Sequence, residues 1–229
     1  ARFEELQQND YQKRNETSEL FIPPGPRLGD KVIEVSNLTK GYGDRVLIDN
    51  LSFTVPKGAI VGIIGANGAG KSTLFHMLQG IEQPDAGTIV IGDTVKLAKT
   101  EEERDEVFIR GFLGKMIFSG EEALKTCNVL SGGEKVRCML SRMMMVRANV
   151  LMLDEPTNHL DLESIQAFNN SLKNYKETVI FTTHDHEFAQ TVANRIIEIT
   201  PKGIIDRYSS FDEYLEDPKI KELRDQMYS

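Results

Sequence analysis

Cysteine and tryptophan are scarce in this chain of 229 residues, which contains two cysteines and no tryptophan. The two cysteines, Cys127 and Cys138, are too few for the disulfide framework of a small secreted domain, so a reducing cytoplasm is expected. No apolar run reaches the length that a bilayer requires, and residues 1–10 do not resemble a signal peptide. These absences favour a cytoplasmic protein that does not span a membrane.

Basic residues are outnumbered by acidic ones. The chain has 27 lysines and arginines against 35 aspartates and glutamates, which gives a formal net charge of −8. This balance argues against broad nucleic-acid binding by this chain alone, although it is compatible with a local basic patch. A hydrophobic content of 40% indicates a globular fold with a sizeable core.

Short apolar segments predict a series of β-strands separated by helical stretches. Several of these segments are continuous apolar runs, which are typical of strands buried on both faces of a parallel sheet. We expect strands at residues 32–35, 52–55, 59–65, 88–92, 150–154, 178–184 and 196–200. Their alternation with helices predicts an α/β fold. Ahead of the strands, residues 21–30 read FIPPGPRLGD and are expected to form a stiff linker.

The stretch GIIGANGAGKST predicts a phosphate-binding loop. It has the form G-x-x-x-x-G-K-[ST] at Gly65, Gly70, Lys71 and Ser72, directly after the apolar segment 59–65. Glycines allow backbone N–H groups to close around phosphate oxygens, and the helix that follows points its positive end at them. We expect Lys71 to reach the β- and γ-phosphates and Ser72 to ligate Mg²⁺. The alternative is a glycine turn that only packs between a strand and a helix.

Two carboxylates follow another predicted strand. The segment VLMLDEPTNHLD places Asp154 and Glu155 directly after the apolar residues 150–153. Because the carboxyl ends of parallel strands meet at one edge of a sheet, these side chains are expected near the phosphates. Asp154 is placed to hold Mg²⁺ through water, and Glu155 is placed to polarise an attacking water. The alternative is a strand end whose acidic side chains are simply solvated.

A second glycine-rich segment, LSGGEK, lies at residues 130–135. Together with the two motifs above, it closely resembles the signature sequence of ATP-binding cassette (ABC) proteins. The resemblance covers about residues 31–210 and implies a P-loop NTPase cassette. Such a cassette has a mainly parallel core sheet, an antiparallel β subdomain and a helical subdomain, which here is shortened and lies at about residues 100–148.

The resemblance also implies that two cassettes pack head to tail. In that arrangement Ser131, Gly132, Gly133 and Glu134 act on the γ-phosphate of the ATP that the opposite cassette binds. A hydroxyl and the N–H groups of a helix N-terminus suit this task because both are attracted to negative charge. The alternative is a glycine turn followed by a core helix. On either interpretation, we expect Cys138, Met139, Met143, Met144 and Met145 of the helix after this segment to fill the core.

Further positions follow from the resemblance one at a time. Tyr42, in KGYGDR, matches the aromatic residue that stacks on adenine, and a surface tyrosine is the alternative. His184 matches the switch histidine at the γ-phosphate, and Asn158 and Asp161 match a loop at the cassette interface. The HDH stretch could instead form a metal pair with His186, but no further cysteine or histidine cluster supports one. The expected catalytic residues are therefore Glu155, His184 and Lys71, and the nucleotide-binding residues are Tyr42, Gly65, Asn67, Gly68, Ala69, Gly70, Lys71, Ser72 and Thr73.

Three segments resemble the ABC-F group of soluble, ribosome-associated ATPases. DEPTNHLD has the ABC-F wording, residues 11–45 resemble the end of the ABC-F interdomain linker and the start of the second cassette, and GIIDRYSSFDEYLE resembles the ABC-F ending. Up to about residue 98 the chain is similar to the translational throttle type. Beyond that point it is similar to another bacterial ABC-F subgroup, which favours a recombined or reconstructed sequence.

This resemblance divides the chain into the end of a linker arm at residues 1–30, a nucleotide-binding domain at 31–210 and a helical tail at 211–229. It implies ATP and Mg²⁺ as cofactors and a second cassette as partner. It further implies ATP-driven action on the ribosome, with its rRNA and tRNA, in translation regulation. The alternatives are the ATPase subunit of an ABC transporter and a nucleotide-gated binding module with little hydrolysis.

One feature of the family is missing from the sequence. Its glutamine loop normally follows a strand after the phosphate-loop helix, yet no glutamine occurs between Gln83 and Gln166. The distance from the phosphate loop to the signature is also shorter than the family norm. We expect ATP binding to survive this loss better than hydrolysis, because Lys71 and Ser72 are unaffected.

Overall fold

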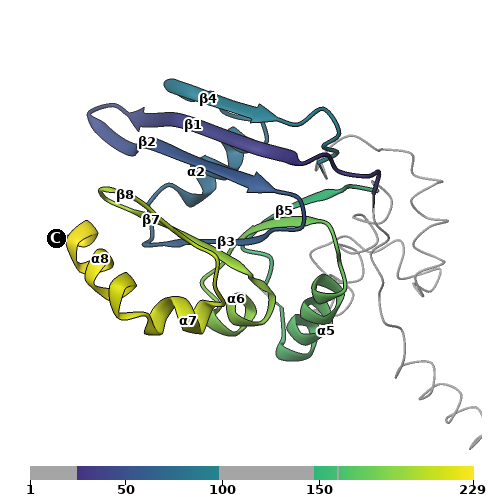
Figure 1. Ribbon diagram of the computed structural model, residues 1–229. Coiled ribbons are helices and arrows are strands. Elements are labelled where there is room, and N and C mark those ends of the chain that lie inside the picture. The colour runs from purple at the N-terminus through teal and green to yellow at the C-terminus, as the bar shows by residue number, and fades with distance from the viewer. Residues whose placement is uncertain (1–24, 98–146, 159) are drawn as a thin grey trace, which may run out of the picture.

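The computed structural model describes residues 25–97, 147–158 and 160–229, which form two stacked sheets and the helices that pack on them (Figure 1). The larger sheet is built from β3 (Ile60–Gly65), β5 (Val150–Asp154), β6 (Thr178–Thr182), β7 (Arg195–Thr200) and β8 (Gly203–Arg207). Its strand order is β5-β6-β3-β7-β8, and all neighbours are parallel except β7 and β8. The predicted α/β fold with a mainly parallel core sheet is confirmed.

The smaller sheet is antiparallel, as the predicted β subdomain requires. It consists of β1 (Lys31–Tyr42), β2 (Arg45–Pro56) and β4 (Ala86–Ile91), in the order β2-β1-β4. The two predicted strands at 32–35 and 52–55 were too short. Because β1 and β2 pair with each other from Lys31 opposite Pro56 to Tyr42 opposite Arg45, each strand extends to 12 residues.

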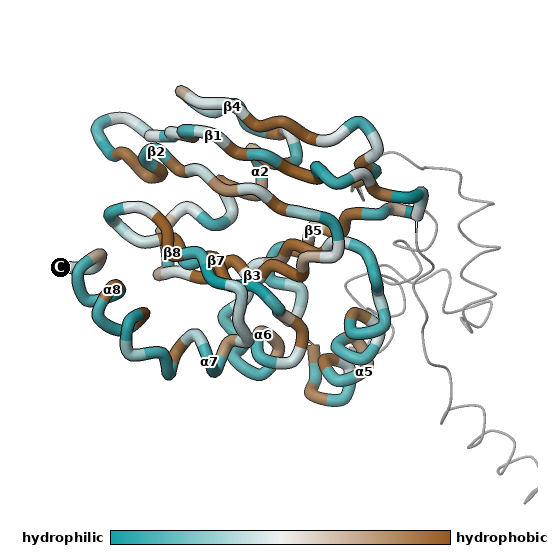
Figure 2. The backbone as a smooth tube through the Cα atoms, in the orientation of Figure 1, coloured by the Kyte–Doolittle hydropathy of each residue, from teal (hydrophilic) through white to brown (hydrophobic). Residues whose placement is uncertain are grey.

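Helices occupy the space between the sheets and the outer face of the larger sheet (Figure 1). Helix α2 (Lys71–Leu78) lies between the sheets and shares one apolar core with both of them. A second core lies between the larger sheet and α5 (Leu162–Lys173), α6 (His186–Val192), α7 (Phe211–Glu216) and α8 (Pro218–Tyr228). Figure 2 shows the apolar central strands between these layers.

The sequence sets where the outer helices begin. Asp161 caps α5 by accepting a hydrogen bond from the Ser164 N–H, and Asp185 caps α6 by accepting one from the Phe188 N–H. Ser210 and Glu213 form a reciprocal capping box on α7. Each side chain satisfies N–H groups that have no partner within the helix.

The expected helical subdomain and most of the expected linker arm lie outside the described residues. The end of the linker is described, and Pro26 is held there by Asn149, a fully buried side chain at the start of β5. The Asn149 amide donates to the carbonyls of Pro26 and Thr94, both at 2.8 Å, and its oxygen accepts from the Lys96 N–H at 2.7 Å. Within the described ranges, no helix combines the length and apolar character needed to span a bilayer.

Arg195 ties the two sheets together. Its side chain is 3% exposed, at the start of β7. The guanidinium donates to the Asp206 carboxylate on β8 at 2.8 Å from Nε, and to the Thr54 carbonyl on β2 at 2.6 Å from Nη1. One planar group with several fixed donors can bridge both partners at once, which a lysine could not do.

We expect Arg195→Met to lower the free energy of unfolding by about 3 kcal/mol, because it leaves the Asp206 carboxylate without its cation and the Thr54 carbonyl without its donor. Denaturant unfolding followed by circular dichroism measures the change. Arg207→Met removes an exposed arginine from β8 and serves as the control. Equal stability of the two variants would contradict the bridging role of Arg195.

Candidate functional site

The predicted phosphate loop joins the end of β3 to the start of α2. Gly65 has a φ of 146°, and a Cβ on this residue would stand 2.6 Å from the Ile199 carbonyl oxygen. Gly70 has a φ of 101° and caps α2, with the Leu47 and Ile48 side chains 3.1 Å from where its Cβ would be. Both positions favour glycine, because an L-residue is strained at these angles, and at Gly65 its Cβ would also collide with the Ile199 carbonyl.

Lys71, the first residue of α2, turns back over this loop. Its ammonium group donates to the carbonyl oxygens of Gly65 at 2.9 Å and Ala66 at 3.1 Å. Burial lowers the pKa of Lys71, and the carboxylates of Glu155 and Asp154 oppose that shift. The lysine thus presents a partly desolvated charge at the loop, where an anionic ligand would stabilise it.

Strands β5 and β6 bring Asp154, Glu155 and Thr182 together at the same sheet edge. Asp154 and Thr182 are direct neighbours in the parallel register. The Thr182 hydroxyl donates to Asp154 Oδ1 and accepts a hydrogen bond from the Glu155 N–H at 2.9 Å. Glu155 has a φ of 46°, in the left-handed region, so its backbone is held in a conformation that costs free energy. Strain of this kind concentrates at functional sites.

His184 reaches the same edge from the loop after β6. Its Nε2 lies 3.2 Å from Glu155 Oε1, so the structure pairs the two predicted catalytic side chains. A cavity of about 240 Å³ adjoins His184, and its lining includes Gly65, Thr183 and His184. The predicted phosphate loop, carboxylates and histidine therefore converge on one site.

Tyr42 lies at the end of β1, next to Thr73 of the phosphate-loop helix. Its ring is half exposed, at 52%, and Lys40 Nζ stands 5.3 Å from the ring centre. The hydroxyl donates to Glu82, which raises the pKa of Tyr42 and lowers that of Glu82. Lys40 also pairs with Asp85 at 3.2 Å.

Sequence reasoning missed Thr182, Lys40, Glu82 and Arg45. Arg45 Nη2 donates to the carbonyl of Gly68 at 3.2 Å, so the β1–β2 hairpin holds the phosphate loop from outside. The β1–β2 hairpin and Glu82 lie close together because β1 pairs with β4. No local sequence motif marks Lys40, Arg45 or Glu82. Thr182 ends β6, and its place near the end of the strand predicted at 178–184, two residues before His184, was the available signal.

The structure describes only some of the remaining predicted residues. Asn158 and Asp161 both lie in the described turn between β5 and α5, where the Asn158 N–H donates to the Glu155 carbonyl at 3.1 Å. His186 pairs with Asp212 at 3.0 Å. In the part of the chain that the structure describes, no group of three or more metal-binding side chains occurs. The four signature residues lie outside the described residues: Ser131, Gly132, Gly133 and Glu134.

Fold and site together define a P-loop nucleotide-binding domain. A family model described as "ABC transporter" matches residues 48–110 and 109–158. A solved nucleotide-free ATP-binding cassette from an ABC transporter superposes with a TM-score of 0.69 at 17% identity, covering 84% of this chain and 98% of that one. A dimeric cassette in a post-hydrolysis state with ADP and phosphate gives 0.63 at 20% identity, covering 77% and 98%. These likenesses show the fold.

Known proteins with similar sequences show to which family the chain belongs. The energy-dependent translational throttle protein EttA of Escherichia coli strain K12 is 48% identical over 241 residues, covering 94% of this chain and 43% of that protein. YkpA of Bacillus subtilis strain 168, described as an uncharacterized ABC transporter ATP-binding protein, is 43% identical over 229 residues, covering 90% and 42%. The chain belongs to the ATP-binding cassette family, and its resemblance to the ABC-F group is confirmed. It spans less than half the length of these relatives.

The comparisons also bear on the shortened middle of the chain. The span aligned with EttA, 241 residues, is longer than the chain of 229 residues, so the relative carries residues that have no counterpart here. The family model also matches in two pieces that meet at residues 109–110. The two-piece match agrees with the predicted short distance between the phosphate loop and the signature.

We expect Thr182→Val to lower the free energy of unfolding by about 1–2 kcal/mol, because the Glu155 N–H and the Asp154 carboxylate both lose a buried partner. Thr182→Ser keeps the hydroxyl and should remain within about 0.5 kcal/mol of the unmodified chain. Thermal or denaturant unfolding compares the three proteins. If valine is tolerated as well as serine, the threonine bridge does not stabilise the strained backbone at Glu155.

Proposed function

We propose that this chain binds ATP at the phosphate loop and hydrolyses it at a site completed by a second cassette. The observation that carries the proposal is the convergence of Lys71, Glu155 and His184 at one edge of the larger sheet. A loop that binds phosphate, a carboxylate that can accept a proton and a histidine beside it are the groups that phosphoryl transfer to water needs.

The phosphate loop supplies binding. Backbone N–H groups of residues 65–70 and the N-terminus of α2 face the position where the β- and γ-phosphates bind, with Asn67 and Thr73 among the contacts. Lys71 exchanges its two carbonyl acceptors for phosphate oxygens, which relieves the cost of its burial. Tyr42 stacks on adenine with the exposed face of its ring.

Ser72 and Asp154 are the residues that would hold Mg²⁺. Ser72 lies in the first turn of α2, Asp154 ends β5, and α2 packs against β5, which supports an ion held between these two residues. A hydroxyl and a carboxylate are the oxygen donors that this ion prefers. When bound there, Mg²⁺ neutralises charge on the β- and γ-phosphates.

Glu155 and His184 have different roles in activating the attacking water. Glu155 accepts the proton of the attacking water, because its carboxylate lies beside His184 and acts on Lys71 of the phosphate loop, and it is not assigned to the ion. His184 donates from Nε2 and orients the pair, as its 3.2 Å separation from Glu155 Oε1 allows.

A second cassette completes the site. The signature residues Ser131, Gly132, Gly133 and Glu134 act on the ATP of the partner, and Asn158 and Asp161 lie at the interface. The dimeric relative with ADP and phosphate supports this arrangement. Since the chain spans 43% of EttA from Escherichia coli, the partner is either a second copy or another cassette of a longer protein.

The relatives favour a role in translation. On this proposal, residues 1–30 end a linker arm, residues 31–210 form the nucleotide-binding domain with its helical part at about 100–148, and residues 211–229 form the helical tail. ATP-driven closure and reopening of two cassettes in the cytoplasm acts on the ribosome through rRNA or tRNA contacts. The name of EttA, an energy-dependent translational throttle protein, supports this assignment.

We expect Glu155→Gln to reduce steady-state phosphate release on the order of a hundred-fold while ATP binding is retained, because glutamine keeps the shape of the side chain but cannot accept the proton. Release of phosphate is measured with a coupled assay, and binding by titration calorimetry. Glu163→Gln, an exposed change in the first turn of α5, is the control and should leave the rate unchanged. Equal rates for both variants would exclude Glu155 as the catalytic carboxylate.

Light scattering of Glu155→Gln with ATP and Mg²⁺ should show a shift from monomer to dimer, because trapped ATP joins the phosphate loop of one copy to the signature of the other. Lys71→Met should stay monomeric under the same conditions, since the loop loses its charge. A protein that binds nucleotide but remains monomeric would mean that two copies of this chain do not close on ATP.

A further inference from the structure

A buried carboxylate lies immediately beside the phosphate loop. Glu198 is 2% exposed in the middle of β7, and it is the register partner of Ile64, the residue before the loop begins. An ionised carboxylate at such a position is costly unless it is paired and hydrogen-bonded. It also places negative charge close to the site that must attract the phosphates of ATP.

The C-terminal helices supply every side chain that satisfies this carboxylate in the described structure. Arg224 of α8 lies 2.9 Å from Glu198 Oε2 through its Nε. The hydroxyls of Tyr214 and Tyr228 donate to the same carboxylate at 2.6 Å and 2.9 Å. Burial is the first cause that raises the pKa of both tyrosines, of Tyr228 to about 12, so both hydroxyls stay protonated as donors.

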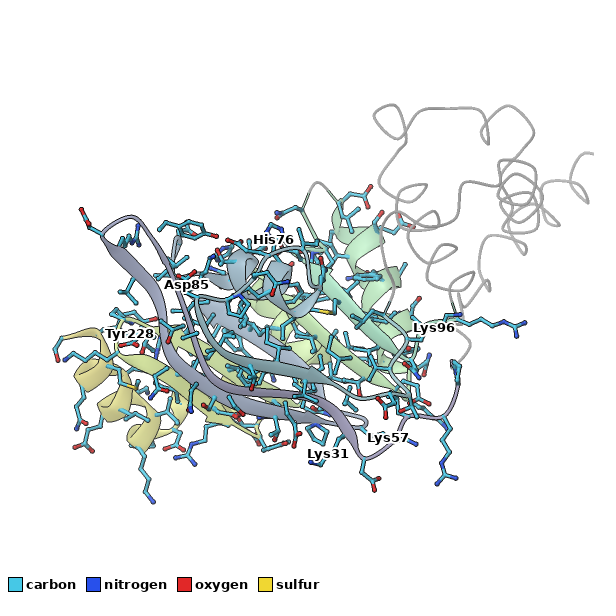
Figure 3. All side chains as sticks on the ribbon, turned by 90° about the horizontal axis from the view of Figure 1, so that it is seen from above. Lys31, Lys57, His76, Asp85, Lys96 and Tyr228 are labelled. Carbon is cyan, nitrogen blue, oxygen red and sulfur yellow. The ribbon has the colours of Figure 1, made fainter. Side chains whose placement is uncertain are left out.

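The same helix reaches the phosphate loop. Tyr228 stands at the end of α8 (Figure 3), and its hydroxyl faces the backbone N–H of Ala66, which lowers the pKa of the tyrosine in part. A cavity of about 590 Å³ lies beside this contact and is lined by residues of both α8 and the loop. Its lining includes Gly65, Ala66, Glu198, Arg224 and Tyr228.

The charges of Glu198 and Arg224 determine how this arrangement affects ATP binding. Arg224 is the cation that contacts Glu198, so this pair is close to neutral toward the loop. Lys221 and Asp225, which line the same cavity, also carry opposite charges. Without Arg224, the Glu198 charge would act on the phosphates uncompensated, at the effective dielectric constant of about 20 that is typical near a protein surface. At a separation of about 10 Å and an effective dielectric constant of about 20, one unit of charge changes binding by about ten-fold.

We propose that Arg224 is a positioning residue for nucleotide binding: by neutralising Glu198 beside the phosphate loop, helix α8 sets the affinity of that loop for ATP. This inference rests on the proposed ATP binding at Lys71. Displacement of α8, for example by a bound partner, would then leave the Glu198 charge without its cation and weaken ATP binding. The C-terminal helix is thereby a control point for the nucleotide site.

The alternative is that Arg224 only anchors α8. The direction in which Glu198→Gln changes the affinity for ATP separates the two roles. Arg224→Met exposes the Glu198 charge and should weaken ATP binding about ten-fold. Glu198→Gln removes the charge but leaves Arg224 beside the loop, and it should tighten binding. The double variant should return to the affinity of the unmodified chain, although both changes disturb the same packing.

The test is a titration of the full chain and these variants with ATP by calorimetry, with melting temperatures recorded for each. Lys219→Met removes one positive charge from an exposed position on the same helix and is the matched control. Arg224→Lys keeps the charge and should stay near the unmodified affinity even if it melts earlier.

Three results would overturn the inference. These are unchanged affinity in Arg224→Met, weaker binding in Glu198→Gln, or a double variant that binds no better than Arg224→Met. If the unmodified chain itself fails to bind ATP, the proposed function fails first, and the inference with it. Retained ATP binding with any of those three results would refute the role of Arg224 alone.

Discussion

The parallel register of β5, β6, β3 and β7 is the constraint on which the site depends. Parallel strands end at the same edge, so the loops that follow them must share that edge. The register places Asp154 beside Thr182 and Ile64 beside Glu198. A shift of one residue would turn each of these side chains to the opposite face of the sheet.

Charge is balanced locally around this edge. Lys71 is buried against loop carbonyls and faces Asp154 and Glu155, while Glu198 on the other flank is met by Arg224. Tyr42 and Lys40 form a similar cluster with Glu82. The proposed nucleotide site thus lies among paired charges. The electrostatic potential at the site therefore depends on whether these ion pairs stay in contact.

Strain and packing hold these charges in place. Glu155 sits in a left-handed backbone conformation that Thr182 stabilises through its hydroxyl. Gly65 allows the loop to pass within contact of the Ile199 carbonyl. Behind the edge, Phe188 packs on Phe168 and Phe181 at 5.8 and 5.0 Å, and this aromatic group fixes the helix that follows His184.

The sequence alone determined the phosphate loop, the carboxylates after β5 and most strands, because short-range spacing and apolar runs encode them. It could not reveal that Thr182 bridges Asp154 and Glu155, that Glu82 meets Tyr42, or that Arg224 reaches Glu198. These contacts join positions 26 to 40 residues apart. Only the pairing of strands and the docking of α8 bring them within hydrogen-bonding distance, because such proximity depends on the fold of the whole domain.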